Sequence, residues 1–332
     1  MAFFDTKRYD RSSFEAEAPD SLAFSFLEPK LSTATAPLAA GHAIVCAFVN
    51  DQLDADTLRL LAGQGVRLIA LRCAGTNNVD LPTARALGMD VARVPAYSPH
   101  AVAEHALTLV LTLNRKVHRA HQRVREGNFS LAGLEGFDLH GRTGGIVGTG
   151  QIGRCFAEIL RGLGMEVLAF DPFPNEAFAE RVGVRYVELD AIWARSDVVS
   201  LHAPLTPQTH HLVDRKAIES MKPGAMLINT SRGGLVDTEA LVEGLKSGQI
   251  GSAGLDVYEE ESEYFFEDRS DQVITDDVLA RLLVFNNVII TSHQAFLTRE
   301  ALANIAATTI QNMKEWLDGR RGSELSNVVE PN

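Results

Sequence analysis

The chain has 332 residues, enough for two domains with large cores. Hydrophobic residues make up 45% and charged residues 22%, which is typical of a globular enzyme. The formal net charge of −12 argues against a nucleic-acid or anionic-membrane partner, because a protein that binds phosphates along a surface needs a basic face. The 3 cysteines are widely spaced, which argues against a disulfide framework and a metal site. No export signal or long apolar run is present, so we expect a cytoplasmic protein.

The first hundred residues alternate between short apolar runs and helix-like segments. Helices are predicted at 54–62, behind an aspartate cap, and at 82–87. The runs predicted as strands are 2–4, 22–27, 43–49, 67–74 and 89–94. Alternation of this kind predicts parallel strands joined by crossover helices, and therefore a small doubly wound domain.

One long helix is predicted over 100–126, after Pro95 and Pro99. Its second half is basic, which we interpret as a solvated helix face. The apolar stripe on which this prediction rests is formed by Val102, Ala106, Leu109, Val110, Leu113 and Val117.

A glycine-rich turn follows an apolar run that ends at 147. Gly148, Gly150 and Gly153 have G-x-G-x-x-G spacing, and the next residues have helical periodicity. The first glycine permits a tight turn, the second lets a pyrophosphate approach the backbone, and the third lets helix and strand pack closely. Asp171 closes the second strand, where its carboxylate would bind ribose hydroxyls and repel a 2′-phosphate. The unit predicts an NAD site.

The remaining chain repeats the alternation. Strands are predicted at 197–202, 225–231, 251–257 and 288–293, and helices at 214–220, 237–246 and 298–317. The segment 259–271 is acidic and irregular, and the last dozen residues are expected to be loosely held. The predicted fold class is α/β with two Rossmann-like doubly wound parallel sheets, with ligand at the carboxyl ends of the strands.

Oxidation of an alcohol by NAD needs a proton acceptor and a cation for the substrate. His293 ends the last predicted strand and is the candidate acid and base. Arg232 follows another strand in a glycine-rich loop, where its planar fork would suit a carboxylate. A glutamate could orient the histidine, but periodicity alone does not choose among Glu259, Glu260 and Glu261. The two glutamates that do not pair with His293 are expected to lie in solvent.

Ordered motifs along the chain resemble the D-2-hydroxyacid dehydrogenase family. They are Val-Ala-Glu-His-Ala, the glycine turn, His-Ala-Pro-Leu-Thr, Asn-Thr-Ser-Arg-Gly, Gly-Leu-Asp-Val-Tyr-x-x-Glu and Thr-Ser-His-Gln-Ala-Phe. Within the family, Arg-Cys-Ala-Gly-Thr-Asn-Asn-Val-Asp and the 264–268 segment look most like fermentative D-lactate dehydrogenases. The resemblance implies a catalytic set of Arg232, Glu261 and His293, with no metal.

The same resemblance implies a flavodoxin-like substrate domain, 1–99 with 297–332, and an NAD-binding domain, 100–296. The implied substrate residues are Gly75, Thr76, Asn77, Asn78, Val79, Tyr97 and Phe296. The implied cofactor residues are Val102, Gly148, Gly150, Gln151, Ile152, Gly153, Asp171, Pro172, His202, Ala203, Pro204, Thr230, Ser231 and Asp256. Asp256 is expected to meet the nicotinamide amide, and Tyr97 and Phe296 to wall the substrate's side-chain pocket.

The implied activity is reversible, NAD-dependent reduction of pyruvate to D-lactate. One alternative is another D-2-hydroxyacid dehydrogenase, which would reduce a branched 2-oxo acid, hydroxypyruvate or glyoxylate. A remote alternative is an NAD-sensing, corepressor-like binding protein. The resemblance also implies a homodimer, or a higher homo-oligomer, through the NAD-binding domain.

Overall fold

A computed structural model of the protein describes residues 1–19, 21–261 and 264–330. The chain divides into two compact units. We call Met1–Ser98 with Phe296–Asn332 the terminal unit, and Pro99–Ala295 the central unit. Among the described residues, no helix has the length and apolar character needed to cross a membrane.

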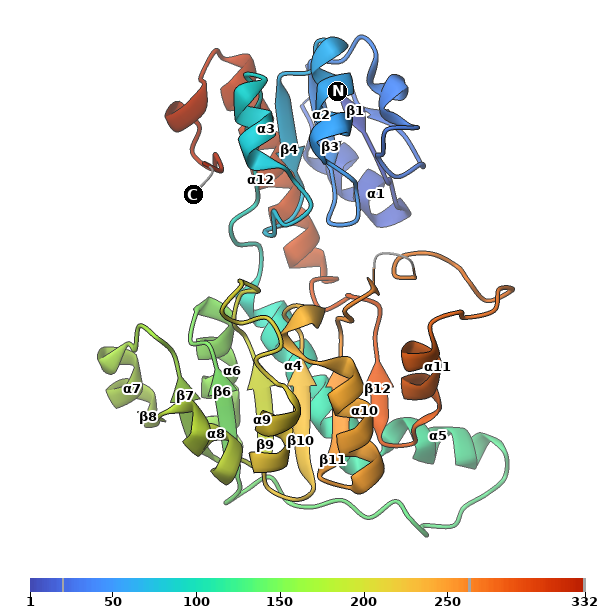
Figure 1. Ribbon diagram of the computed structural model, residues 1–332, viewed down its shortest axis with the longest axis vertical. Helices are drawn as coiled ribbons and strands as arrows, with labels where there is room; N and C mark the ends of the chain where they lie inside the picture. The colour runs from blue at the N-terminus through green and yellow to red at the C-terminus, as the bar shows by residue number, and fades with distance from the viewer. Residues whose placement is uncertain (20, 262–263, 331–332) are drawn as a thin grey trace. The chain divides into compact units, whose positions relative to one another are not determined.

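The terminal unit is built on a five-stranded parallel sheet in the order β2-β1-β3-β4-β5. This is the flavodoxin-like order, as predicted. Figure 1 labels β1, β3 and β4 of this sheet. Each strand lies close to a predicted apolar run. The strands are β1 (Ala2–Phe3), β2 (Ser25–Phe26), β3 (Ile44–Ala47), β4 (Leu68–Leu71) and β5 (Asp90–Ala92).

The helices of this unit begin at polar caps. Asp54 accepts the Thr57 N–H at the start of α2 (Ala55–Gly63), and Asp80 caps α3 (Leu81–Ala86) in the same way. The final helix α12 (Arg299–Leu317) packs on β4 and on α1 (Arg8–Glu17). Periodicity did not predict α1 because only Asp10 and Phe14 of its residues are buried.

The prediction that the last residues are loosely held is wrong for those that the structure describes. Val329 donates its N–H to Val91 O at 2.7 Å, and Arg93 donates to Asn327 O at 3.0 Å. Leu325 is buried. The polar tail extends the sheet beside β5 through backbone hydrogen bonds, which an apolar pattern does not reveal.

The central unit contains a seven-stranded parallel sheet in the order β12-β11-β10-β9-β6-β7-β8 (Figure 1). The strands from β8 to β11 follow the Rossmann order, and β12 adds one strand at the edge. They are β6 (Thr143–Val147), β7 (Glu166–Phe170), β8 (Val184–Tyr186), β9 (Val198–Leu201), β10 (Ala225–Asn229), β11 (Ile250–Leu255) and β12 (Val288–Ile290).

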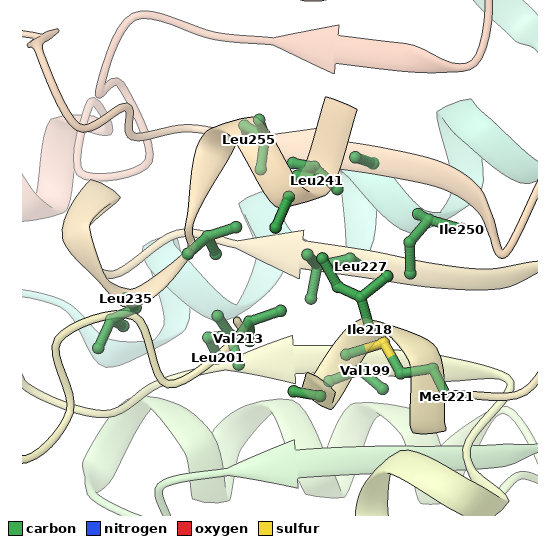
Figure 2. Packing of buried hydrophobic residues seen from close by; sticks show 14 of the residues in the cluster. Val199, Leu201, Val213, Ile218, Met221, Leu227, Leu235, Leu241, Ile250 and Leu255 are labelled. Atoms are coloured by element: carbon green, nitrogen blue, oxygen red, sulfur yellow. The ribbon is translucent and has the colours of Figure 1, made fainter. Parts of the chain in front are cut away.

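Helices cover both faces of this sheet, because successive strand residues point to opposite sides. Val199 and Leu227 face the cluster drawn in Figure 2, whereas their neighbours Val198 and Ile228 face the other core. The first core is covered by α8 (Leu189–Arg195), α9 (Arg215–Ser220), α10 (Thr238–Ser247) and α11 (Asp277–Val284). The second lies under α4 (Pro99–Arg115), α6 (Gln151–Gly162) and α7 (Glu176–Val182).

The single helix predicted over 100–126 is wrong. The chain breaks at Lys116, which has a left-handed φ of 49°, and continues as α5 (Val117–Arg125). No residue of α5 is buried, and Val117 is 56% exposed, so the apolar stripe ends with α4. Basic side chains here fasten the following loop: Lys116 donates to Glu135 O, and Arg123 donates to Ala132 O at 2.7 Å.

Candidate active site

The glycine turn between β6 and α6 is shaped by packing at two positions. Gly148 has a φ of +94°, and a Cβ atom there would lie 2.7 Å from the backbone of His202. A Cβ atom at Gly153 would lie 2.0 Å from Gly148 O. Glycine is therefore required at both positions by backbone conformation and close approach.

Gly150 differs from both, since a Cβ atom there would meet nothing within 4 Å. This glycine is the N-cap of α6, which begins at Gln151 and continues through Ile152. The first N–H groups of a helix lack partners within the helix and attract anions. The space over Gly150 therefore suits the pyrophosphate of a dinucleotide.

Asp171 lies directly after β7 and is held beside this turn. Its Oδ2 accepts hydrogen bonds from Thr149 N at 2.6 Å and Thr149 Oγ1 at 3.0 Å, and its Oδ1 accepts one from Phe173 N at 2.9 Å. The Thr149 hydroxyl also contacts the Tyr186 hydroxyl at 2.8 Å. The carboxylate is thus placed where a ribose would follow the pyrophosphate.

Other implied cofactor residues differ in their exposure. The His202 ring lies against Phe156 and bonds Ser200 Oγ at 2.9 Å, and burial lowers its pKa to about 3, so it is neutral.

Thr230 is buried, and its Oγ1 has no hydrogen-bond partner among the described residues, which suits a ligand contact. Two others are half-buried, Ala203 and Ser231, while Val102 is buried and Pro172 and Pro204 are exposed.

Asp256 is fully buried, and its carboxylate is bound within the protein. Oδ1 accepts from Thr291 Oγ1 at 2.5 Å and from Gln294 N at 2.9 Å, and Oδ2 accepts from Ala295 N at 2.9 Å. Burial alone would raise the pKa of Asp256, but hydrogen bonds from His105 and Thr291 hold it below its usual value. The Oδ2 atom accepts a single hydrogen bond and has a lone pair left, so the expected contact with a nicotinamide amide stays a prediction. Asp256 also shapes the turn after β12.

That turn presents His293. The residue has a φ of 48° and donates its N–H to Asp256 O at 2.8 Å. Its Nδ1 bonds Glu261 Oε1 at 2.8 Å, and Glu261 Oε2 accepts from Tyr258 N at 3.1 Å. The side chains are 16% and 17% exposed. Within the described part of the chain Nε2 has no hydrogen-bond partner, so it is the nitrogen that remains for a substrate.

The neighbouring glutamates have different surroundings. Glu260 is exposed, but the expectation that Glu259 is solvated is wrong. Glu259 Oε1 contacts His211 Nε2 at 2.6 Å, and Oε2 accepts hydrogen bonds from Thr238 N, at 3.0 Å, and from Thr238 Oγ1. Thr238 begins α10, so Glu259 satisfies a free N–H at that helix start. The choice left open among the glutamates therefore falls on Glu261.

Arg232 lies in the loop after β10. Asn229 braces this loop by accepting from Ser231 N at 3.0 Å and donating to Arg232 O at 2.8 Å. A Cβ atom at Gly233 would lie 2.1 Å from Tyr258 O, so the loop packs directly against the segment that carries Glu261. Arg232 Nη1 donates to Ser231 O at 2.6 Å, and its guanidinium forms no ion pair with any residue that the structure describes.

The implied substrate loop, 75–79, follows β4 in the terminal unit. Asn78 Nδ2 donates to Phe48 O and Asp51 O, both at 2.8 Å, and Val79 N donates to Thr76 O at 3.1 Å. In the described structure the backbone N–H groups of 75–78 make no hydrogen bond. Successive free N–H groups suit a carboxylate.

Phe296 lies at the centre of an aromatic cluster in the same unit. Its ring centroid is 6.4 Å from that of Tyr97, the other implied wall residue. It is also 6.2 Å from Tyr9 and 6.0 Å from Phe48, which the sequence did not single out. No local sequence pattern marks Tyr9 or Phe48, because they lie far apart in the chain and only the fold brings them to Phe296.

Comparison with known proteins gives the family. Residues 107–295 match the family model described as "D-isomer specific 2-hydroxyacid dehydrogenase, NAD binding domain". A D-lactate dehydrogenase of Escherichia coli is 51% identical, over 94% of this chain and 95% of that protein. A 2-hydroxyacid dehydrogenase homolog of Haemophilus influenzae is 49% identical, over 100% of this chain and 99% of that protein.

Solved structures agree. The apo-structure of the Escherichia coli D-lactate dehydrogenase has a TM-score of 0.89 at 46% identity and covers 99% of each chain. A D-lactate dehydrogenase with NAD⁺ from Lactobacillus jensenii has a TM-score of 0.82 at 31% identity, with 99% of each chain covered. The chain belongs to the D-isomer-specific 2-hydroxyacid dehydrogenase family, whose members are NAD-dependent oxidoreductases.

Proposed function

We propose that this protein reduces pyruvate to D-lactate with NADH and catalyses the reverse reaction. The observation that carries the proposal is the His293–Glu261 contact at 2.8 Å, with the Arg232 loop packed against the same segment. Relatives that are named D-lactate dehydrogenases and match over nearly the whole chain support the choice of substrate.

In the proposed mechanism the Arg232 fork binds the pyruvate carboxylate through two N–H groups and polarises the ketone. The Gly148–Gly153 turn would hold NADH, which would supply a hydride to C2 of the ketone. His293 donates the proton on Nε2 to the ketone oxygen as the hydride arrives, which gives the hydroxyl of lactate. Glu261 holds Nδ1–H and so keeps Nε2 directed at the substrate.

The roles of the two domains follow from these residues. We assign substrate binding to 1–99 with 297–332, because the free N–H groups at 75–78 and the rings of Tyr9, Phe48 and Tyr97 belong there. NAD binding is assigned to 100–296, which holds the glycine turn and Asp171.

We further infer that the protein acts in the cytoplasm as a homodimer, or a higher oligomer, formed through the central unit. Support comes from α5, which has no buried residue, and from the loop after it, where Phe129 is 74% and Leu131 is 81% exposed. Apolar side chains exposed to this degree are common at interfaces. Light scattering of the purified protein checks the oligomer, and a monomer at micromolar concentration contradicts it.

The substrate assignment is tested by a turnover assay with NADH and a panel of 2-oxo acids. We expect the highest kcat/KM for pyruvate, lower values for a branched 2-oxo acid, hydroxypyruvate and glyoxylate, and D-lactate as the product. NADPH should be a poor donor because Asp171 would face its 2′-phosphate. A higher kcat/KM for another 2-oxo acid overturns the choice of pyruvate, and no turnover of any substrate favours the corepressor alternative.

A further inference from the structure

A second cluster of ionisable side chains lies in the central unit, outside the proposed catalytic set. It consists of His210, His211 and Glu259, and one ligand atom from each lies within 4.8 Å of the others. We call it the His-His-Glu cluster. The catalytic mechanism uses none of these residues.

The three side chains are already held together. His211 Nε2 is 2.6 Å from Glu259 Oε1, and the rings of His210 and His211 are stacked with centroids 3.9 Å apart. His211 has a left-handed φ of 51° and donates its N–H to Gly234 O at 2.8 Å. The backbone conformation of the adjacent histidines is thus defined by the fold and not only by side-chain contact.

The other oxygen of Glu259 is bonded to Thr238 N and Thr238 Oγ1. A carboxylate anchored through one oxygen can present the other to a ligand in a fixed orientation, as outer hydrogen bonds do for metal-binding side chains. His210 is exposed, and the side chains of His211 and Glu259 are 36% and 24% exposed, so an ion from solvent can reach the cluster.

Two imidazoles and one carboxylate form a donor set for Zn²⁺ and neighbouring transition metals. Mg²⁺ and Ca²⁺ prefer oxygen ligands and suit it poorly. We propose that the His-His-Glu cluster binds a divalent transition-metal ion such as Zn²⁺, with water in the fourth position, and that binding inhibits the dehydrogenase.

The inhibition follows from the position of Glu259 in the chain. Glu259 belongs to the same short segment as Glu261, the partner of His293. A Cβ atom at Gly233 would lie 2.4 Å from Glu259 N, so the Arg232 loop touches this residue as well. His211 Nε2 and Glu259 Oε1 lie 2.6 Å apart, whereas two ligands of a tetrahedral zinc lie about 3.3 Å apart. The ion must therefore move these side chains apart, and the shift is carried to a segment that contacts both halves of the proposed catalytic set.

Binding is tested on the whole purified chain with Zn²⁺ in competition with a chromophoric indicator. We expect one site per chain in the wild type, weakened at least about tenfold in His210→Ala. His121→Ala is the matched control, since it also removes an exposed histidine but lies on α5, and it should bind as the wild type does. Equal affinity in His210→Ala, or no stoichiometric site in the wild type, overturns the proposal.

The inhibition depends on the proposed activity, whereas the binding measurement does not, so the two claims fail separately. Micromolar Zn²⁺ should slow pyruvate reduction by the wild type and by His121→Ala, and a chelator should restore it. His210→Ala should resist the same concentration. Inhibition of His210→Ala to the same extent would place the inhibitory ion elsewhere and overturn the coupling.

Discussion

The terminal and central units each contain a basic side chain that contacts a carboxylate, but the two clusters differ in their access to solvent. In the terminal unit, Arg72 is 1% exposed, donates to Asp5 O at 2.7 Å and lies 3.3 Å from Asp10 Oδ1. In the central unit, His293 and Glu261 are each about one-sixth exposed, and the imidazole keeps one nitrogen free of partners among the described residues.

Burial determines what each cluster can do. The Arg72 guanidinium lies over the rings of Phe3 and Phe48, 4.6 Å from each centroid, so its charge is matched inside the protein and no substrate reaches it. A charge of this kind organises the fold, and removing it leaves unpaired partners in a dry interior. The His293–Glu261 pair is only half-buried, so its imidazole can exchange a proton with a ligand.

The largest expected effect is the loss of catalysis in His293→Gln without loss of folding. Removal of a general acid and base lowers kcat by about 10²- to 10⁴-fold. The melting temperature should stay within a few degrees of the wild type, because the side chain is not in a core. Steady-state kinetics with NADH and calorimetry measure the two quantities, and a fully active variant would remove His293 from the mechanism.

Arg72→Met should produce the opposite result. Breaking a buried ion pair by removing one partner costs about 3–5 kcal/mol, so the free energy of unfolding should fall by that amount in urea titrations. The fraction that remains folded should keep its kcat. A stable variant with a lower kcat would show that Arg72 acts on the reaction.

Asp51 is a buried carboxyl whose charge interacts with that of Arg72, so it tests the buried cluster through pH. Burial raises its pKa to about 6, against about 3.9 for an unfolded chain. Because the folded-state pKa is raised, this carboxyl contributes stability at low pH that is lost as the pH rises from about 4 to 6, by at most about 1.4 kcal/mol per pH unit.

Asp51→Asn should lack that loss, so the difference in unfolding free energy between wild type and variant should change across this window. Urea titrations at several pH values check it. Parallel curves from pH 4 to 7 would show that the pKa of Asp51 is the same in the folded and the unfolded chain, and would contradict the raised value.

A smaller effect is expected for Arg232→Lys. The charge remains but the two-pronged fork is lost, so kcat/KM for pyruvate should fall roughly tenfold or more, about 1.4 kcal/mol. Arg185→Lys, an exposed site in the same unit, is the control and should not change. Equal kcat/KM for both variants would mean that Arg232 has no carboxylate to bind.

Local sequence predicted the parts of this molecule that depend on local chemistry. The glycine turn and the capped helices follow from backbone requirements at single residues, and the strands follow from apolar runs. The contact between His293 and Glu261 was predicted only through the family motif, because periodicity treats the adjacent glutamates alike. In the structure Glu259 accepts a hydrogen bond from Thr238 N at the start of α10, and Glu260 lies in solvent.

What was missed depends on contacts between distant segments. The break at Lys116 separates a buried helix from one with no buried residue, and no glycine or proline marks it. The tail is bound through backbone hydrogen bonds to β5, and the Phe296 cluster gathers rings from Tyr9, Phe48 and Tyr97. The enclosure of Asp256 likewise depends on the turn after β12.

The central claim is that the open His293–Glu261 pair performs the proton transfer, and the most direct test compares adjacent glutamates. Glu261→Gln keeps the shape but removes the charge that holds the imidazole, so kcat for pyruvate reduction should fall at least about tenfold. Glu260 is the adjacent residue and its side chain is exposed, so Glu260→Gln removes the same charge and should leave kcat unchanged. Equal kcat values for these two variants would contradict the account.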